Sequence, residues 1–256
     1  MKNKIINGDC IEELKKLPEN SVDLVVTSPP YNVGINYDCW DDKKPFEEYK
    51  KFMRNWLGGV FRVLKDDGRI ALNILYEINI KENGGRLLLV SEYWEVMKNI
   101  GFKFAGIVDL RESNPHRVKL TVWGSWLSPS APYIYNPKEC VIIAYKNQWK
   151  KLIKGKSYFN KDNKKEFQEL VYGMWDYRAE TKGLTKANFS LDIPMKAIKI
   201  LTYEENIVLD PFLGSGTTGV ACAKLNRDFI GIEISKEYVR IAKARIKPFL
   251  EQRKLK

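Results

Sequence analysis

The residues with the clearest chemical potential are Ser28-Pro29-Pro30-Tyr31, which follow an apolar stretch of the chain. Two consecutive prolines make a stiff turn and leave carbonyl oxygens that no helix or sheet ladder uses. The Ser28 hydroxyl and a proline carbonyl could accept both N–H bonds of a conjugated amine, while the Tyr31 ring stacks on the planar ring that carries the amine. The turn therefore predicts a site that aims a weakly nucleophilic amine at an electrophile without a strong base. A rigid turn with a purely structural role is the alternative.

A glycine-rich loop forms the second candidate site. Gly214, Gly216 and Gly219 follow a short apolar segment that ends at Asp210, and they precede a helical pattern. Glycines at this spacing let a ligand approach the backbone closely, and an acid at the end of the next strand, Glu233, could accept hydrogen bonds from ribose hydroxyls. The loop predicts a nucleotide-like ligand, although a tight turn that only requires glycine would give the same pattern.

Two classes of ligand fit this loop. In dinucleotide-dependent oxidoreductases the glycine pattern usually opens a long domain, and the short stretch after Gly219 disfavours that class. A carboxylate at Asp210 disfavours a nearby pyrophosphate and favours a cationic ligand such as S-adenosylmethionine, which carries a sulfonium and an ammonium. Phe212 could face that cation or could pack in the core.

The elements that would position these residues alternate between apolar strands and helical patterns, which indicates an α/β fold with a mainly parallel sheet. Strands are expected over 4–7, 22–27, 69–75, 207–210 and 229–234, with later strands, which could run antiparallel, over 102–110, 119–123 and 139–145. Helices are expected over 11–17, 46–64, a stretch ending near 100–101, 193–201, 217–225 and 236–250. Because parallel strands share one carboxyl edge, residues far apart in the sequence would meet there.

Residues 146–186 differ from the rest of the chain. They hold eleven Lys or Arg, five Asp or Glu, and aromatic residues without clean periodicity. We expect an insertion rather than a part of the sheet, placed against a polyanion, although a solvated surface would look similar. The candidate phosphate contacts are Lys150, Lys151, Lys154, Lys156, Lys164 and Lys165.

The motifs in this order resemble those of the amino-directed DNA methyltransferases, which methylate exocyclic nitrogens, in the permuted beta-type arrangement. Ser-Pro-Pro-Tyr comes first, the basic segment lies in the middle, and Asp210-Pro211-Phe212 with the glycine loop comes last. The resemblance implies one Rossmann-like methyltransferase sheet, mostly parallel with an antiparallel edge and with helices on both faces. It divides the chain into a catalytic half (1–145), a basic and aromatic target-recognition insertion (146–187) and a cofactor-binding half (188–256).

The resemblance also implies S-adenosyl-L-methionine as cofactor and assigns its contacts. Glu233 would bind the ribose, and Asp9, which the sequence alone predicts as a helix N-cap, would meet the adenine amine. The methionine end would lie against Asp210, Phe212, Gly214, Gly216 and Thr217. Weaker contacts are expected at Asn188, Phe189 and Pro194, where the family often has a His-Pro or Lys-Pro element.

A serine before the double proline resembles the members that methylate cytosine N4, whereas adenine-N6 members more often carry aspartate. We therefore expect a site-specific cytosine-N4 methyltransferase that acts on a base flipped out of double-stranded DNA and serves beside a restriction endonuclease. The alternatives are adenine-N6 transfer, a NAD-dependent oxidoreductase and a non-catalytic nucleic-acid-binding protein. The loop 32–42 could close over the base, and the loop 123–129 could enter the target side or simply pack.

Composition excludes other chemistries. The single histidine, His116, argues against a His-rich metal centre or a Ser-His-Asp hydrolase, and we expect no metal. None of the four cysteines follows a proline or forms a CxxC pair, which disfavours cytosine-C5 methylation and a zinc site. No apolar run reaches the roughly 18 residues of a membrane span. We expect a cytoplasmic monomer or homodimer whose net charge of +11 suits a polyanionic partner.

Overall fold

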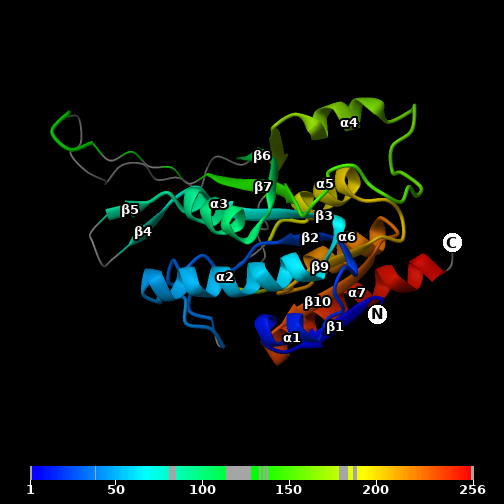
Figure 1. Cartoon of the computed structure of the whole chain (residues 1–256), viewed down its shortest axis with the longest axis horizontal. Coiled ribbons are helices and arrows are strands. Elements are labelled where there is room, and N and C mark those ends of the chain that lie inside the picture. Colours follow the sequence, from blue (N-terminus) through cyan, green and yellow to red (C-terminus); the bar gives the residue numbers. More distant parts are fainter. Residues whose placement is uncertain are drawn as a thin grey trace.

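The computed structural model describes residues 2–37, 39–80, 85–113, 128–132, 134, 136, 138–178, 184–186 and 189–254. In these ranges an eight-stranded sheet has the order β1-β10-β9-β2-β3-β7-β6-β8, with helices on both faces (Figure 1). Its strands are β1 (Lys4–Asn7), β2 (Val22–Thr27), β3 (Leu64–Leu75), β6 (Lys103–Glu112), β7 (Glu139–Tyr145), β8 (Met174–Tyr177), β9 (Ile207–Asp210) and β10 (Asp228–Glu233). The helices are α1 (Cys10–Lys16), α2 (Phe46–Val63), α3 (Leu89–Ile100), α4 (Lys164–Val171), α5 (Asp192–Leu201), α6 (Thr217–Lys224) and α7 (Lys236–Lys254). The expected fold class is confirmed.

Strand direction brings the candidate sites to one edge of the sheet. Strands β1, β10, β9, β2 and β3 pair in parallel, so their carboxyl ends lie together. Strand β7 runs antiparallel to β3 and β6, and its first residue, Glu139, pairs with Leu75 at the end of β3. The carboxyl edge therefore collects the ends of β1, β2, β3, β9 and β10 and the start of β7.

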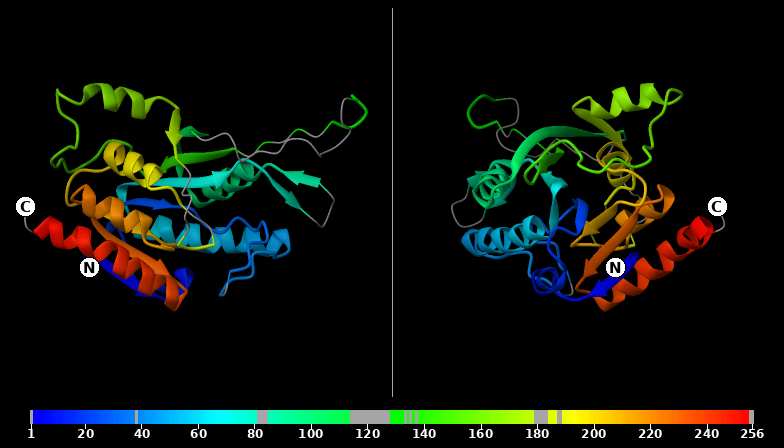
Figure 2. Two further views of the ribbon diagram at one scale, coloured as in Figure 1. Left: turned by 180° about the vertical axis from the view of Figure 1, so that it is seen from behind. Right: turned by 45° about the vertical axis from the view of Figure 1, so that its right-hand side comes forward.

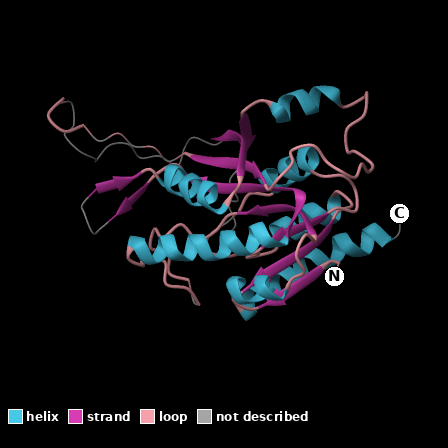
Figure 3. Cartoon of the chain, in the orientation of Figure 1, coloured by secondary structure: helices cyan, strands magenta, loops and turns pink. Residues whose placement is uncertain are grey.

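Two apolar layers hold this sheet between helices (Figures 2 and 3). Helices α1, α2 and α3 cover one face, and α5, α6 and α7 cover the other. The expected apolar stripe of α2 is confirmed, because its buried residues recur at helical spacing: Tyr49, Phe52, Met53, Trp56, Leu57, Val60 and Val63. Among the described residues no helix is both long and apolar enough to cross a membrane.

The expectation that residues 146–186 stay outside the sheet is wrong for their last part. Strand β8 pairs in parallel with β6 and forms the edge of the sheet. Trp175 is only 1% exposed, and its indole N–H donates a hydrogen bond to the Leu170 carbonyl at 2.8 Å. The sequence did not predict β8, because four residues are too few to show periodicity and Trp175 lies in a charged segment.

The first part of the same segment runs along the opposite, amino edge of the sheet. The backbone N–H of Lys146 bonds the Gly68 carbonyl at 3.0 Å, and the Arg69 guanidinium bonds the Trp149 carbonyl at 2.6 Å. Residues 65–68, expected as a turn, form an irregularity inside β3, because the pairing with β2 shifts between Leu64 and Arg69.

A hairpin that the sequence did not indicate projects from the carboxyl edge. Strands β4 (Ile78–Ile80) and β5 (Gly85–Leu87) pair in antiparallel fashion directly after β3. Figures 1 and 2 show this hairpin and residues 128–132 extending beyond the sheet on the same side, away from residues 146–163. The strand expected over 119–123 lies outside the described residues.

Candidate active site

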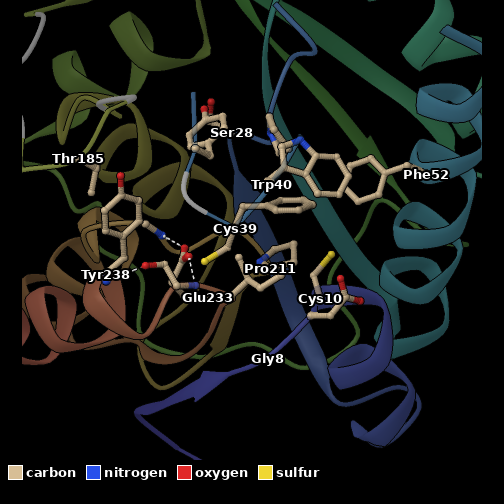
Figure 4. Close-up of a pocket in the computed structure, with 17 residues that line it drawn as sticks. Gly8, Cys10, Ser28, Cys39, Trp40, Phe52, Thr185, Pro211, Glu233 and Tyr238 are labelled. Carbon is tan, nitrogen blue, oxygen red and sulfur yellow. Dashed lines mark hydrogen bonds between the residues drawn. The ribbon is translucent and has the colours of Figure 1, made fainter. Parts of the chain in front are cut away.

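A pocket opens at the carboxyl edge, where the ends of β1, β2, β9 and β10 meet (Figure 4). Several residues predicted from the sequence line it: Asp9, Ser28, Pro30, Phe212, Gly214 and Glu233. Pro211 of the cofactor motif also lines it, as do Tyr37, Cys39 and Trp40 from the loop that was expected to close over the base. Residues that the sequence did not single out complete it: Gly8, Cys10, Phe52, Thr185, Ile234, Ser235 and Tyr238. The structure thus brings both candidate motifs to one cavity.

Two carboxylates at strand ends shape this pocket. Glu233 accepts hydrogen bonds from the Gly214 N–H at Oε2 and the Ser235 N–H at Oε1, both at 2.8 Å. Burial raises the pKa of Glu233 above its ordinary value. Asp9 Oδ1 accepts from the backbone N–H groups of Ile11 and Glu12, which confirms the predicted N-cap of α1. No lysine or arginine is among the described residues that line the cavity.

Asp210 stabilises the fold by hydrogen bonds and does not line the pocket. Its carboxylate is 2% exposed and accepts hydrogen bonds from Thr27 Oγ1 at 2.7 Å, Thr218 Oγ1 at 2.6 Å and the Phe212 N–H at 3.0 Å. Burial raises the pKa of Asp210 to about 6, and these hydrogen bonds act in the opposite direction. Asp210 is not among the residues that line the pocket, and it ties the end of β2 to the glycine loop.

Gly216 and Thr217, two predicted ligand contacts, pack against helix α7. A Cβ on Gly216 would lie 3.0 Å from Ala242 Cβ, and a Cβ on Gly219 would lie 2.4 Å from Ile246 Cδ1. Thr217 is 3% exposed, and its hydroxyl accepts a hydrogen bond from Arg245 at 2.8 Å. Close packing of α6 on α7 explains these residues. Gly214 is different, because its Cβ position is open and it lines the pocket.

The Ser28 turn is fixed by hydroxyl groups with a defined direction. Tyr31 donates its single hydroxyl proton to the Asn73 carbonyl at 3.1 Å, and the oxygens of Tyr31 and Ser28 lie 2.6 Å apart. Tyr31 has one hydroxyl proton, so both hydrogen bonds form together only with Ser28 as the donor between the two hydroxyls. The lone pairs of Ser28 Oγ thus remain free to accept hydrogen bonds, as the sequence analysis expected. Tyr31 itself packs against the core cluster of α1, α2 and α3 and does not line the pocket.

A second pair of hydroxyls supports the turn from behind. The buried Tyr49 of α2 donates to the Pro30 carbonyl at 2.7 Å, and the Tyr49 and Tyr93 hydroxyls lie 2.8 Å apart. Since Tyr49 gives its proton to Pro30, Tyr93 of α3 is the donor between them. The Pro30 carbonyl is thereby used, and among the described residues no donor bonds the Pro29 carbonyl. Sequence periodicity placed Tyr49 in the core but could not show what its hydroxyl binds.

A family model described as DNA methylase, that of the N6 and N4 methyltransferases, matches residues 22–244. The Type II methyltransferase M.MjaVI of Methanocaldococcus jannaschii is 40% identical over 70% of this chain and 87% of its own length. The chain belongs to this DNA methylase family. Members of the family use S-adenosyl-L-methionine as the methyl donor, and the resemblance drawn from the sequence is confirmed.

Solved structures show the same fold as this DNA methylase. The protein TTHA0409 of Thermus thermophilus, complexed with S-adenosyl-L-methionine, superposes with a TM-score of 0.76 at 24% identity, over 97% of this chain and 94% of that one. The cytosine-N4-specific PvuII DNA methyltransferase superposes with a TM-score of 0.73 at 20% identity, over 99% and 93% of the two chains.

Two of the three weaker cofactor contacts, Phe189 and Pro194, are not among the residues that line the pocket of this DNA methylase. Pro194 is buried in α5, and Phe189 packs against the core cluster between the sheet and α5, α6 and α7. Asn188 lies outside the described residues. Thr185, which precedes them, lines the pocket instead.

The predicted phosphate contact at Lys151 is wrong. Its side chain is 7% exposed and lies 3.2 Å from the Asp67 carboxylate and 3.7 Å from that of Asp23. Burial lowers the pKa of Lys151, and both acids oppose that shift. Asp67 is buried together with Lys151.

The other predicted lysines lie away from the pocket. Lys150, Lys154 and Lys156 are exposed, but they belong to the stretch that is bonded to the amino edge, where the Glu204 N–H meets the Lys156 carbonyl before β9. Lys164 and Lys165 begin α4, which precedes the outermost strand, β8. The structure therefore does not bring the lysine set to the edge that carries Ser28.

Proposed function

We propose that this DNA methylase transfers the methyl group of S-adenosyl-L-methionine to the exocyclic N4 amine of a cytosine flipped out of double-stranded DNA. The observation that carries the proposal is the pair of free acceptors, Ser28 Oγ and the Pro29 carbonyl, in a turn that borders the pocket. Flipping is required because a base inside a duplex cannot reach such a turn.

The pocket suits a cationic nucleoside. Glu233 and Asp9 provide negative charge and hydrogen-bond acceptors, and Phe52, Trp40 and Phe212 provide aromatic surface. The absence of lysine and arginine among its described lining residues disfavours the pyrophosphate of a dinucleotide. When bound, S-adenosyl-L-methionine supplies a methyl group on a positively charged sulfur.

The turn supplies orientation rather than strong base catalysis. Ser28 Oγ and the Pro29 carbonyl would each accept one N–H of the amine, so that the nitrogen lone pair points away from both acceptors. The Tyr31 hydroxyl holds Ser28 by a hydrogen bond, and the Tyr49 hydroxyl holds the turn by donating to the Pro30 carbonyl, next to Pro29. Holding the amine in this way lowers the entropy cost of attack on the methyl group.

Ser28 favours cytosine over adenine in this proposal, because serine before the double proline resembles the cytosine-N4 members. Adenine-N6 transfer is the second candidate, since the same two acceptors would hold the amine of adenine. The likeness to the Type II methyltransferase M.MjaVI supports a role as the modification partner of a restriction system.

The duplex would dock on the carboxyl edge, because the flipped base must reach Ser28 there. The β4–β5 hairpin and residues 128–132 extend beyond the sheet on this side (Figure 1) and are placed to flank the duplex. The lysines of residues 150–156 lie at the opposite, amino edge of the sheet, so we do not expect them to contact the duplex.

A labelling experiment tests the proposal. The protein is incubated with methyl-labelled S-adenosyl-L-methionine and DNA of mixed sequence, and the DNA is hydrolysed to nucleosides and resolved by mass. We expect N4-methyl-2′-deoxycytidine; N6-methyl-2′-deoxyadenosine would select the second candidate. Label in neither nucleoside, together with tight NADH binding in calorimetry, would refute methyl transfer.

A further inference from the structure

The carboxyl ends of the paired strands β1 and β10 form two walls of the pocket (Figure 4). Six lining residues come from these strand ends: Gly8, Asp9 and Cys10 after β1, and Glu233, Ile234 and Ser235 at and after the end of β10. Each wall brings one carboxylate to the cavity, Asp9 on the first and Glu233 on the second. The way the two strand ends are joined therefore sets the separation of these two acids.

The side chain of Asn7 joins the two walls. Asn7 is the last residue of β1 and pairs with Glu233, the last residue of β10. Its Nδ2 donates one hydrogen bond to the Glu233 carbonyl and one to the Ile234 carbonyl, both at 2.9 Å. The Gly8 N–H also donates to the Glu233 carbonyl, at 3.0 Å. Asn7 thus carries the connection between the strands one residue beyond the end of β10.

An asparagine suits this position because its amide nitrogen carries two protons on a short side chain. Both partners are carbonyl oxygens, which only accept, so each proton meets one acceptor. A serine would supply one proton and an aspartate none. Asn7 is exposed, so the packing of the core does not depend on its side chain. A substitution of Asn7 therefore removes the two hydrogen bonds without leaving a cavity.

We propose that Asn7 is a positioning residue of the cofactor site, which holds the Glu233 wall to the Asp9 wall so that both carboxylates meet the adenosine part of S-adenosyl-L-methionine. The ribose hydroxyls and the adenine amine are donors, and the two carboxylates are acceptors. Asn7 is not among the residues that line the pocket, so it acts through Asp9 and Glu233. This inference rests on the cofactor pocket of the proposed function.

The variant Asn7→Ala tests the link. Walls that are joined only part of the time bind the cofactor more weakly, and we expect the Kd for S-adenosyl-L-methionine in calorimetry to rise about fivefold, as for one lost hydrogen bond. The Kd for 5′-methylthioadenosine, which keeps adenine and ribose but lacks the amino-acid end, should rise by the same factor. Unchanged affinities would overturn the inference. A rise for S-adenosyl-L-methionine alone would place the effect at the methionine end and would also overturn it.

Asn3→Ala is the matched control, because Asn3 joins the same two strands at their other end. Its Nδ2 donates to Asp228 Oδ1 at 3.1 Å. Asn3 has a φ of +54°, which strains an alanine, so this variant should lose at least as much free energy of unfolding as Asn7→Ala. Its Kd for S-adenosyl-L-methionine should nevertheless stay within about twofold of the parent. Equal weakening of cofactor binding in the two variants would show that stability alone governs the affinity and would overturn the inference.

Asn7→Asp keeps the size of the side chain but turns an acceptor toward the two carbonyl oxygens. Its added negative charge would by itself attract the cationic cofactor, so weaker binding reflects the lost donors. We expect the Kd for S-adenosyl-L-methionine to rise about tenfold, and binding as tight as in the parent would overturn the inference.

Turnover separates this positioning role from damage to the Ser28 turn. Saturating cofactor should restore kcat to within about twofold of the parent in both Asn7 variants, because neither touches that turn. A kcat that stays low at saturating cofactor would overturn the inference. A parent protein that binds neither S-adenosyl-L-methionine nor 5′-methylthioadenosine would instead refute the proposed function.

Discussion

Replacing Gly216 with alanine should destabilise the fold rather than fill the pocket. Gly216 has a φ of +87°, and a Cβ there would lie 2.9 Å from Ile246 Cδ1 and 3.1 Å from Ala242 Cα. The Ile246 side chain can turn away, but the Ala242 atom belongs to the backbone of α7 and cannot. Gly216→Ala therefore forces α6 and α7 apart.

The magnitude follows from two costs. A left-handed backbone costs an alanine about 1 kcal/mol relative to glycine. Overpacking against α7 adds about 1–3 kcal/mol. The free energy of unfolding should thus fall by about 2–4 kcal/mol, measured by urea denaturation without ligand.

Gly214→Ala is the matched control for this measurement. Gly214 also has a positive φ, +54°, but no heavy atom lies within 4 Å of its Cβ position. Its loss of stability should be limited to about 1 kcal/mol from the backbone. The packing argument is wrong if Gly216→Ala loses no more stability than Gly214→Ala. A stable Gly216→Ala that no longer binds S-adenosyl-L-methionine would restore the ligand contact expected from the sequence.

Three further measurements test the site. Ser28→Ala should slow single-turnover methyl transfer by about 3 kcal/mol, roughly a hundredfold, with cofactor affinity nearly unchanged, and transfer at the parent rate would show that the turn is only structural. Burial raises the pKa of Asp210 from 3.8 to about 6, so the unfolded chain releases this proton first as the pH rises. The contribution of Asp210 to the free energy of unfolding should fall by about 2 kcal/mol between pH 4 and 6, and urea titrations should show this fall missing in Asp210→Asn. Joint replacement of Lys150 and Lys154 by alanine should leave the Kd for DNA within about twofold over a salt titration, and a tenfold loss would move the duplex to the amino edge.

The sheet was largely predictable because each central strand is a short, continuous apolar run. Strands β1, β2, β7 and β9 occupy the expected residues. Residues that cannot continue a strand mark such ends, as Ser28-Pro29-Pro30 does after β2. The β4–β5 hairpin and β8 were missed because three or four residues carry no measurable period. Their strand character comes from neighbours: β8 is fixed by pairing with β6 and by burial of Trp175.

The site was predictable where a side chain acts at the end of its own strand. Asp9, Ser28 and Glu233 follow or end strands of the parallel sheet, so one edge had to collect them. The loop 32–42 was expected to close over the base, but a loop shows neither helical nor strand periodicity. The sequence therefore could not show that Trp40 lines the pocket or that Asp42 is buried. Only the folded loop reveals that Asp42 gathers four peptide N–H groups.

By itself the sequence determined the fold class and the order of the motifs, and it predicted an amine-holding turn, because these depend on local residue types and spacing. The tertiary structure decided which of those residues line the pocket. Asp210, Gly216 and Thr217 belong to the cofactor motif, yet each is used by contacts from other elements: Thr27 on β2, Ala242 on α7 and Arg245 on α7. The tertiary structure also decided that Lys151 pairs with buried acids. A lysine has the same charge whether it contacts a phosphate or Asp67, so the sequence could not distinguish the two partners.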